Sequence, residues 1–178
     1  VNNRTHRKVL VVDGLVGFTG GVGIAKEWEG DARDPSEWRD DHFRVRGPAV
    51  RHLQGAFAED WREATGEVLL GRCMFRPLEA EGAATVLPLV TSPGGRPSPI
   101  AFLYWLALHV ASERVDIATP YFLPDDDFIE SMGVAVQRGV RIRLLVPGEH
   151  NDAVLLRTAS LARYEMILGK GVELYEYE

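Results

Sequence analysis

A histidine and a lysine lie two residues apart near the start of the sequence, as His6 and Lys8 in the stretch HRKVLVVDG. Side chains two apart on a β-strand project from the same face, and Leu10 and Val12 are expected to continue this face into the interior. A neutral imidazole is a nucleophile near neutral pH, because its reference pKa is about 6.5. The pair therefore predicts attack on an anionic phosphorus centre. His6 would form a phospho-histidine, and Lys8 would hold the non-bridging oxygens.

Asp13 stands an odd number of positions after His6 and so does not share its strand face. The Asp13-Gly14 step joins two apolar runs, which predicts a hairpin turn. Two roles remain open for Asp13, either a turn residue bonded to local backbone amides or a direct participant in catalysis. Glycines 20 and 21 then allow a backbone to approach a ligand closely, and free N–H groups at a following helix start would favour phosphate oxygens.

Apolar periodicity and turn residues predict the elements that position these residues. Strands are expected over residues 8–12, 15–19, 42–47, 85–91, 114–119, 140–146 and 172–177, and helices over 24–28, from Pro48 onward, 99–112, 126–139 and 152–168. Strands and helices alternate in the second half, which predicts an α/β fold with a mixed or parallel sheet flanked by helices. A shift toward Gly, Ala, Ser and Pro near residues 70–83 predicts two parts, residues 1–75 and 76–178.

Two apolar segments are expected to pack in the core. Val50, Leu53, Phe57 and Trp61 recur at spacings of three and four residues, which places them on one helical stripe. Residues 100–111 form the longest apolar run of the chain. This run is shorter than the ~20 residues that cross a bilayer, so it predicts a buried helix.

The composition is that of a globular protein. The 178 residues are 46% hydrophobic and 26% charged, with a net charge of −6, which argues against a general nucleic-acid binder. The single cysteine excludes a disulfide within the chain. No Cys or His cluster has metal-ligand spacing, so neither a metal nor another cofactor is expected. The sequence has no signal peptide or membrane span, and the segment itself is expected to be soluble.

The stretch HRKVLVVDGLVGFTGGVGIAKEW resembles the H-x-K-x4-D motif of the phospholipase D superfamily, and in particular bacterial cardiolipin synthases. The positions that match are His6, Lys8, Asp13, Thr19, Gly20 and Gly21. The segments EWRDDHFRVRGPAVRHLQGAFAEDW, ATPYFLPDDDF and GVRIRLLVPG also resemble these synthases, in the same order. One position departs from the pattern, because Gly23 stands where many members have an asparagine.

The resemblance implies roles for further residues. An acidic residue downstream of the motif orients the catalytic histidine in the family, and Asp40 is the first candidate for it, with Asp41 as the alternative. Thr19, Gly20 and Gly21 would bind phosphate together with Lys8. Tyr121 and Phe122 either line a lipid or headgroup pocket or pack above the sheet. Residues 1–75 would be the C-terminal part of a first lobe, and residues 76–178 the N-terminal part of a second.

The superfamily builds one active site from two H-x-K motifs, and this sequence contains one of them. None of the other histidines has a lysine two residues later: His42, His52, His109 and His150. We expect the second motif within a few residues after Glu178 in a longer parent protein, or else in a homodimer partner. The isolated chain is therefore expected to have little or no activity.

The resemblance implies phosphatidyl transfer that joins two phosphatidylglycerol molecules into cardiolipin and releases glycerol. The alternatives are a phospholipase D or nuclease of the same superfamily, and an inactive fragment or non-enzymatic binding domain. The expected partners are an anionic phospholipid and, through the full-length protein, the cytoplasmic face of a bacterial membrane, with no nucleic acid. Because the chain is acidic, lipid binding would need a local cationic pocket such as Arg4, Arg7 and Lys8, or membrane segments elsewhere.

Overall fold

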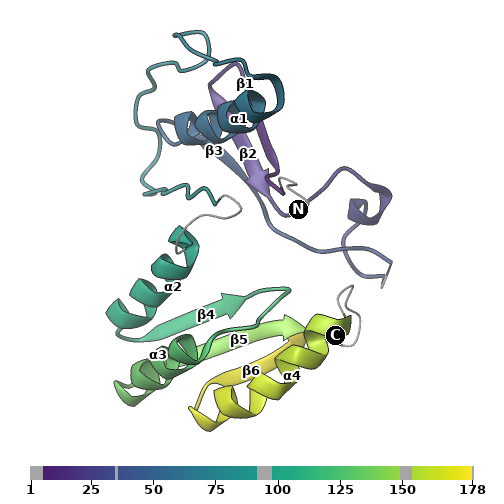
Figure 1. The fold of residues 1–178 in the computed structure, drawn as a ribbon, viewed down its shortest axis with the longest axis vertical. Helices are drawn as coiled ribbons and strands as arrows, with labels where there is room; N and C mark the ends of the chain where they lie inside the picture. Colours follow the sequence, from purple (N-terminus) through teal and green to yellow (C-terminus); the bar gives the residue numbers. More distant parts are fainter. Residues whose placement is uncertain (1–5, 35, 92–97, 149–153, 178) are drawn as a thin grey trace. The chain divides into compact units, whose positions relative to one another are not determined.

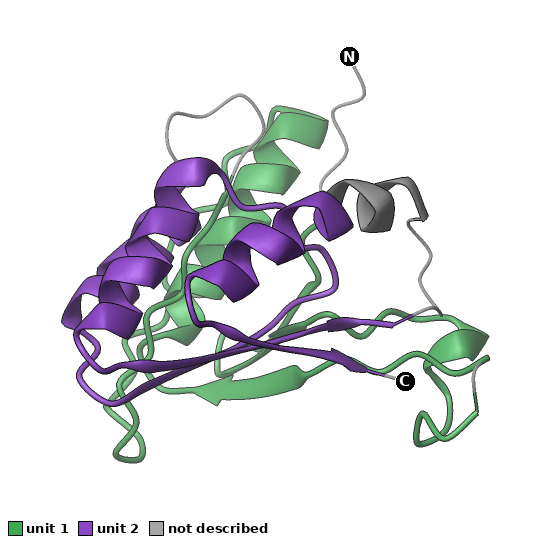
Figure 2. Cartoon of the chain, turned by 90° about the horizontal axis from the view of Figure 1, so that it is seen from below, with its two compact units in different colours: residues 1–95 green, residues 96–178 purple. Residues whose placement is uncertain are grey.

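The chain divides into two compact units, residues 1–95 (unit 1) and residues 96–178 (unit 2), coloured separately in Figure 2. The structure is a computed structural model that describes residues 6–34, 36–91, 98–148 and 154–177. The division after Gly95 lies beyond the predicted one after residue 75. The reason is that the segment up to Thr91 belongs with unit 1, where Thr91 O accepts a hydrogen bond of 3.1 Å from Arg7.

Unit 1 is an antiparallel sheet with one covering helix (Figure 1). Its elements are β1 (Val9–Val12), β2 (Val16–Gly20), the short 3₁₀ helix η1 (Lys26–Trp28), β3 (His42–Arg46) and α1 (Val50–Thr65), and the strand order is β1-β2-β3. The predicted hairpin is confirmed. Asp13 and Gly14 both have positive φ angles, 54° and 68°, as a type I′ turn requires at its two central residues.

Helix α1 covers one face of β1 and β2 through its first half. Val50 and Leu53 are buried, and Leu53 Cδ1 would lie 2.6 Å from a Cβ atom at Gly17, so the helix approaches the sheet where a side chain is absent. The predicted stripe is wrong beyond this point. Phe57 and Trp61 are 40% and 38% exposed, and their rings stack on each other at 5.9 Å.

The other face of the unit 1 sheet carries no helix within the described residues. Leu10 and Val12 are 58% and 44% exposed, so the expectation that they point into the interior is wrong. The strand predicted over residues 85–91 is also absent, since these residues are described as irregular chain. Pro88 interrupts this stretch and offers no backbone N–H for a strand ladder.

Unit 2 has the alternation of helices and strands that its sequence predicts. Its elements are α2 (Pro99–Val110), β4 (Arg114–Ala118), α3 (Asp126–Gln137), β5 (Arg141–Pro147), α4 (Val154–Gly169) and β6 (Glu173–Tyr177). The strands form a parallel sheet in the order β4-β5-β6. Asp125 caps α3, because its carboxylate accepts a 2.8 Å hydrogen bond from Phe128 N.

The core of unit 2 lies between its helices and one face of its sheet (Figure 2). Alternation along β5 buries Ile142, Leu144 and Val146 on this face. Helices and loops contribute the other buried members, Leu108, Ile129, Met132, Ala135, Val140, Ile167 and Val172. The opposite face carries charged pairs, so this sheet is covered on one side within the described residues.

Helix α2 differs from the buried helix that the sequence predicts. Leu108 is buried, but Phe102, Tyr104 and Val110 are 60%, 51% and 71% exposed. Its end is fixed by Arg138 of the α3 C-terminus, whose guanidinium donates to Leu108 O at 2.6 Å. None of the helices in the described residues is both long enough and apolar enough to span a membrane.

Candidate functional site

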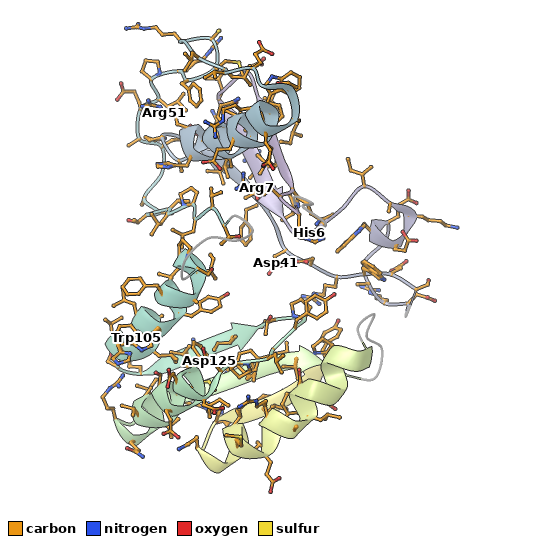
Figure 3. The ribbon with its side chains drawn as sticks, in the orientation of Figure 1. His6, Arg7, Asp41, Arg51, Trp105 and Asp125 are labelled. Carbon is orange, nitrogen blue, oxygen red and sulfur yellow. The ribbon has the colours of Figure 1, made fainter. Side chains whose placement is uncertain are left out.

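The reactive pair of the sequence lies on the backbone just before β1. The Lys8 ammonium is 3.5 Å from Nδ1 of His6, and His6 is exposed (Figure 3). Strand alternation explains the contact, because residues 6 and 8 project to the same side of an extended backbone. The structure therefore brings together the two residues on which the predicted chemistry depends.

The contact between Lys8 and His6 has a consequence for the imidazole tautomer. If the Lys8 ammonium donates to Nδ1 across this 3.5 Å contact, the ring proton of a neutral His6 is on Nε2. Attack by Nε2 requires the opposite tautomer, with the proton on Nδ1. An anion that binds the Lys8 ammonium would draw it away from Nδ1 and release the ring for this change.

A cavity of about 1320 Å³ opens beside the pair in unit 1. His6, Lys8, Thr19 and Gly20 line it, so the structure gathers four of the predicted site residues around one space. The remaining walls come from Arg7, Val9, helix α1 and residues 88–91. This space is large enough for a phosphodiester and part of the groups attached to it.

Gly20 and Gly21 are needed for the close approach of β3 and the residues before it. A Cβ atom at Gly20 would overlap Asp41 O and lie 2.6 Å from His42 Cα, and one at Gly21 would overlap the Asp40 carboxylate. Gly21 N also donates a 3.0 Å hydrogen bond to Asp41 O. The backbone that lies against these two glycines is thus that of β3 and of the residues just before it, not a ligand.

Asp40 lies at this edge without a hydrogen bond to His6. Its Oδ1 atom accepts a 2.7 Å hydrogen bond from Asp41 N, and its carboxylate lies against Gly21. Lys8 is the hydrogen-bond partner that the described residues offer to His6. An orienting role of Asp40 or Asp41 toward His6 therefore stays a prediction.

Asp13 lies at the other end of the hairpin from the pair. Val9 pairs with Thr19 and Val12 pairs with Val16, so the turn that holds Asp13 is at the opposite end of β1 from His6. Asp13 lines a separate cavity of about 260 Å³ together with residues such as Met74. The structure thus gives Asp13 the turn position and does not bring it to His6.

Arg7 is a site residue that the sequence analysis did not single out for its own role. Its side chain is 17% exposed and forms ion pairs with Asp60 at 2.8 Å and Glu59 at 3.1 Å. It also donates to Ala56 O at 3.2 Å. The predicted cationic pocket of Arg4, Arg7 and Lys8 is thereby reduced, because α1 carboxylates offset the charge of Arg7. Arg4 lies outside the described residues.

Gly23, which departs from the family pattern, has an indole in the space of its missing side chain. A Cβ atom there would lie 2.9 Å from Trp28 Nε1. Trp28 in turn packs edge-on against Trp38 at 5.4 Å between ring centroids. The space that a side chain at position 23 would need is thus taken by the Trp28 indole.

Tyr121 and Phe122 follow β4 in unit 2 and have different surroundings. Phe122 packs against the core and meets Phe128 edge-on at 6.3 Å, which is the packing alternative left open by the sequence. Tyr121 is 49% exposed. A lipid-contacting role is therefore a prediction for Tyr121 rather than for Phe122.

The carboxyl groups whose pKa values are lowered by arginines lie on the exposed face of the unit 2 sheet. Hydrogen bonds from Arg141, and after it from Tyr175, lower the pKa of Glu173 from 4.5 to about 2. A hydrogen bond from Arg143 lowers the pKa of Asp116 in the same way. Within the described residues, no group of three His, Cys, Asp or Glu side chains is placed to hold a metal ion.

The parallel sheet and helices of unit 2 are consistent with a phospholipase D-like domain. Residues 106–178 match the family model described as "Cardiolipin synthase, PLD-like domain", so this part of the chain is similar to that domain. Curated relatives cover the whole chain, including the residues around His6.

Three of these relatives illustrate the similarity. The chain is 38% identical over 180 residues to a cardiolipin synthase of Geobacillus kaustophilus, covering 100% of this chain and 36% of the relative. It is 36% identical over 179 residues to one of Alkalihalophilus pseudofirmus, covering 99% and 35%. It is 34% identical over 178 residues to cardiolipin synthase A of Pseudomonas putida, covering 100% and 36%. The chain thus spans about a third of the length of these relatives.

Proposed function

We propose that this chain supplies the first H-x-K half of an active site that transfers a phosphatidyl group from one phosphatidylglycerol molecule to another. The products are cardiolipin and glycerol. The observation that carries the proposal is the His6–Lys8 contact at the wall of a large cavity, in a chain whose curated relatives are named cardiolipin synthases.

The first step forms a bond between His6 Nε2 and the phosphorus of phosphatidylglycerol. The bond between phosphorus and the headgroup oxygen breaks, and a second histidine donates a proton so that glycerol leaves as an alcohol. In the second step a hydroxyl of another phosphatidylglycerol attacks phosphorus and gives its proton to that histidine. The nitrogen–phosphorus bond then breaks, which yields cardiolipin and restores His6.

Lys8 acts on the charge of the phosphodiester. Its ammonium leaves Nδ1 of His6 and binds the non-bridging oxygens, where it offsets the negative charge that grows in the transition state. Thr19 and Gly20 line the same cavity, which supports a role for them in binding these oxygens. Because the chain has a net charge of −6, this local cation is the feature that attracts an anionic lipid.

The second histidine comes from outside these 178 residues, since no other histidine here is followed by a lysine two positions later. We place the second H-x-K motif in a longer natural protein, and keep a second copy of the chain as the alternative. The substrate is a membrane lipid, so the site would work at the surface of a bacterial membrane, on its cytoplasmic face.

The test is a lipid assay on the natural gene product that contains this chain. Vesicles of phosphatidylglycerol are incubated with the protein, and cardiolipin and released glycerol are measured. We expect both products with the wild type, and their loss with His6→Ala. His52→Ala is the matched control, because His52 is an exposed histidine of α1 and should leave turnover unchanged.

Three other results would overturn the proposal. Formation of phosphatidic acid without cardiolipin would indicate a phospholipase D. Cleavage of DNA, with the lipid left intact, would indicate a nuclease. Cardiolipin formation that persists unchanged in His6→Ala would show that the reaction does not use this half-site.

A further inference from the structure

We propose that Arg7 is a positioning residue that fixes the His6–Lys8 pair against helix α1 and residues 88–91, an inference that rests on the proposed function. Arg7 lies between the two reactive residues in sequence and projects to the opposite side of the backbone. Its guanidinium points toward α1, while Arg7, His6 and Lys8 all line the same cavity.

The contacts of Arg7 join three segments that wall the cavity. Nη1 donates to Asp60 Oδ1 at 2.8 Å and to Ala56 O at 3.2 Å, both on α1. Nη2 donates to Thr91 O at 3.1 Å. A planar guanidinium has donors in a fixed fork, so these bonds set the orientation of Arg7 as well as its position.

The backbone of His6, Arg7 and Lys8 is not held by strand pairing, so the hydrogen bonds of Arg7 matter for its position. Pairing of β1 with β2 begins at Val9 and Thr19, so His6, Arg7 and Lys8 precede the ladder that holds the rest of the hairpin. The hydrogen bonds of Arg7 hold these three residues in place instead of a strand ladder. Figure 3 shows Arg7 beside α1, while His6 lies at the free end of the sheet.

The charge of Arg7 is directed at carboxylates rather than at a ligand. Glu59 and Asp60 both form ion pairs with it, and both line the cavity. Loss of Arg7 would therefore have two separable effects. The pair would lose its fixed position, which lowers kcat, and two carboxylates would face the cavity without the charge of Arg7, which raises KM for an anionic lipid.

The experiment compares kcat and KM of variants of the natural gene product with phosphatidylglycerol vesicles as substrate. We expect Arg7→Gln to lower kcat about ten- to a hundredfold, since misplacement of reacting groups by about 1 Å costs up to about a hundredfold. Arg7→Lys should recover part of this loss, because an ammonium still pairs with Asp60. Arg51→Gln removes an exposed arginine of α1 and is the matched control (Figure 3).

A triple variant separates position from charge. Combining Arg7→Gln with Glu59→Gln and Asp60→Asn should restore KM and leave kcat low. Recovery of kcat in this variant, or a wild-type kcat in folded Arg7→Gln, would overturn the inference. If circular dichroism shows that Arg7→Gln does not fold, Asp60→Asn is used instead, because it weakens the contact of Arg7 with α1. A lowered kcat of Asp60→Asn would support the inference, and a wild-type kcat would overturn it.

His6→Ala, measured in parallel, distinguishes this inference from the proposed function. If His6→Ala keeps wild-type turnover, the proposed function fails whatever Arg7 does. If His6→Ala is inactive while folded Arg7→Gln has wild-type kcat, only the role of Arg7 is refuted.

Discussion

The two units of the chain hold their residues in place by different means. Unit 2 has a continuous apolar core in which Met132, Leu144 and Ile167 are 0% exposed. Unit 1 buries few large side chains, among them Val50 and Leu53, and carries the reactive pair before its sheet begins. Its His6–Lys8 segment depends on ion pairs and hydrogen bonds of Arg7 instead.

The comparison shows that the apolar core lies in unit 2 and the reactive pair lies in unit 1. A close-packed core resists changes at its centre but leaves no polar groups free to act. The polar contacts of unit 1 cost less to rearrange, and they leave His6 exposed beside a cavity. Substitutions in unit 2 should therefore change stability first, and substitutions around His6 should change activity first.

The largest effect on stability is expected at the centre of the unit 2 core. Leu144→Ala should lower the free energy of unfolding of the 178-residue chain by about 2–5 kcal/mol, because it leaves a cavity. The neighbouring Leu145 is 37% exposed on the other face of the sheet, so Leu145→Ala should cost less than about 1 kcal/mol. Urea unfolding measures both, and equal losses would contradict the one-sided core.

The largest effect on activity is expected in unit 1. Lys8→Ala should lower kcat of the natural gene product about a hundred- to a thousandfold, because the transition state loses its charge partner, while the melting temperature changes little. Lys8→Arg should retain part of the activity. Lys26→Ala, at an exposed lysine of η1, is the control. A wild-type kcat in Lys8→Ala would show that Lys8 of unit 1 does not take part in the reaction.

A smaller effect is expected where β2 and β3 touch. Gly20→Ala should destabilise the 178-residue chain by about 1–3 kcal/mol, because the new methyl group meets the backbone of Asp41 and His42. Gly55 lies in α1 with nothing within 4 Å of its Cβ position. Gly55→Ala should therefore stabilise by about 0.5–1 kcal/mol. Thermal melting gives both signs, and stabilisation by Gly20→Ala would contradict the close approach.

The smallest effect concerns acid on the open face of unit 2. Because Arg141 lowers the pKa of Glu173 from 4.5 to about 2, the ionised carboxylate stabilises the folded chain above about pH 4.5. This contribution is lost as the pH falls toward 2. Glu173→Gln should flatten the decline of unfolding free energy over this range, with Glu113→Gln as an exposed control. An unchanged slope in Glu173→Gln would show that this pair does not couple to folding.

The sequence predicts most of unit 2 because its signals are local. The strand predicted over residues 140–146 and the helix over residues 126–139 follow from neighbouring residues, and so does the Asp13-Gly14 turn of unit 1. The apolar spacing misassigns Phe57, since the burial of a helical side chain depends on what the rest of the fold packs against it. The apolar content of residues 100–111 likewise predicted a buried helix, whereas much of α2 is exposed.

The site itself is predictable only in part. The spacing of His6 and Lys8 is enough to place them together, because alternation is a property of any strand. The role of Arg7 depends on Asp60 and Thr91, which are 53 and 84 residues away in the chain. Acidic residues at positions 59 and 60 give a weak signal for a buried arginine, but no sequence pattern names its partner.

The most direct test of the account is to trap the covalent intermediate in the natural gene product. Phosphatidylglycerol labelled at phosphorus is mixed with the protein, the reaction is quenched with alkali within the first turnover, and the labelled peptide is mapped. The account predicts an acid-labile phosphorus–nitrogen bond at His6 that is absent from His6→Ala and present in His52→Ala. Label on another histidine that persists in His6→Ala would contradict it.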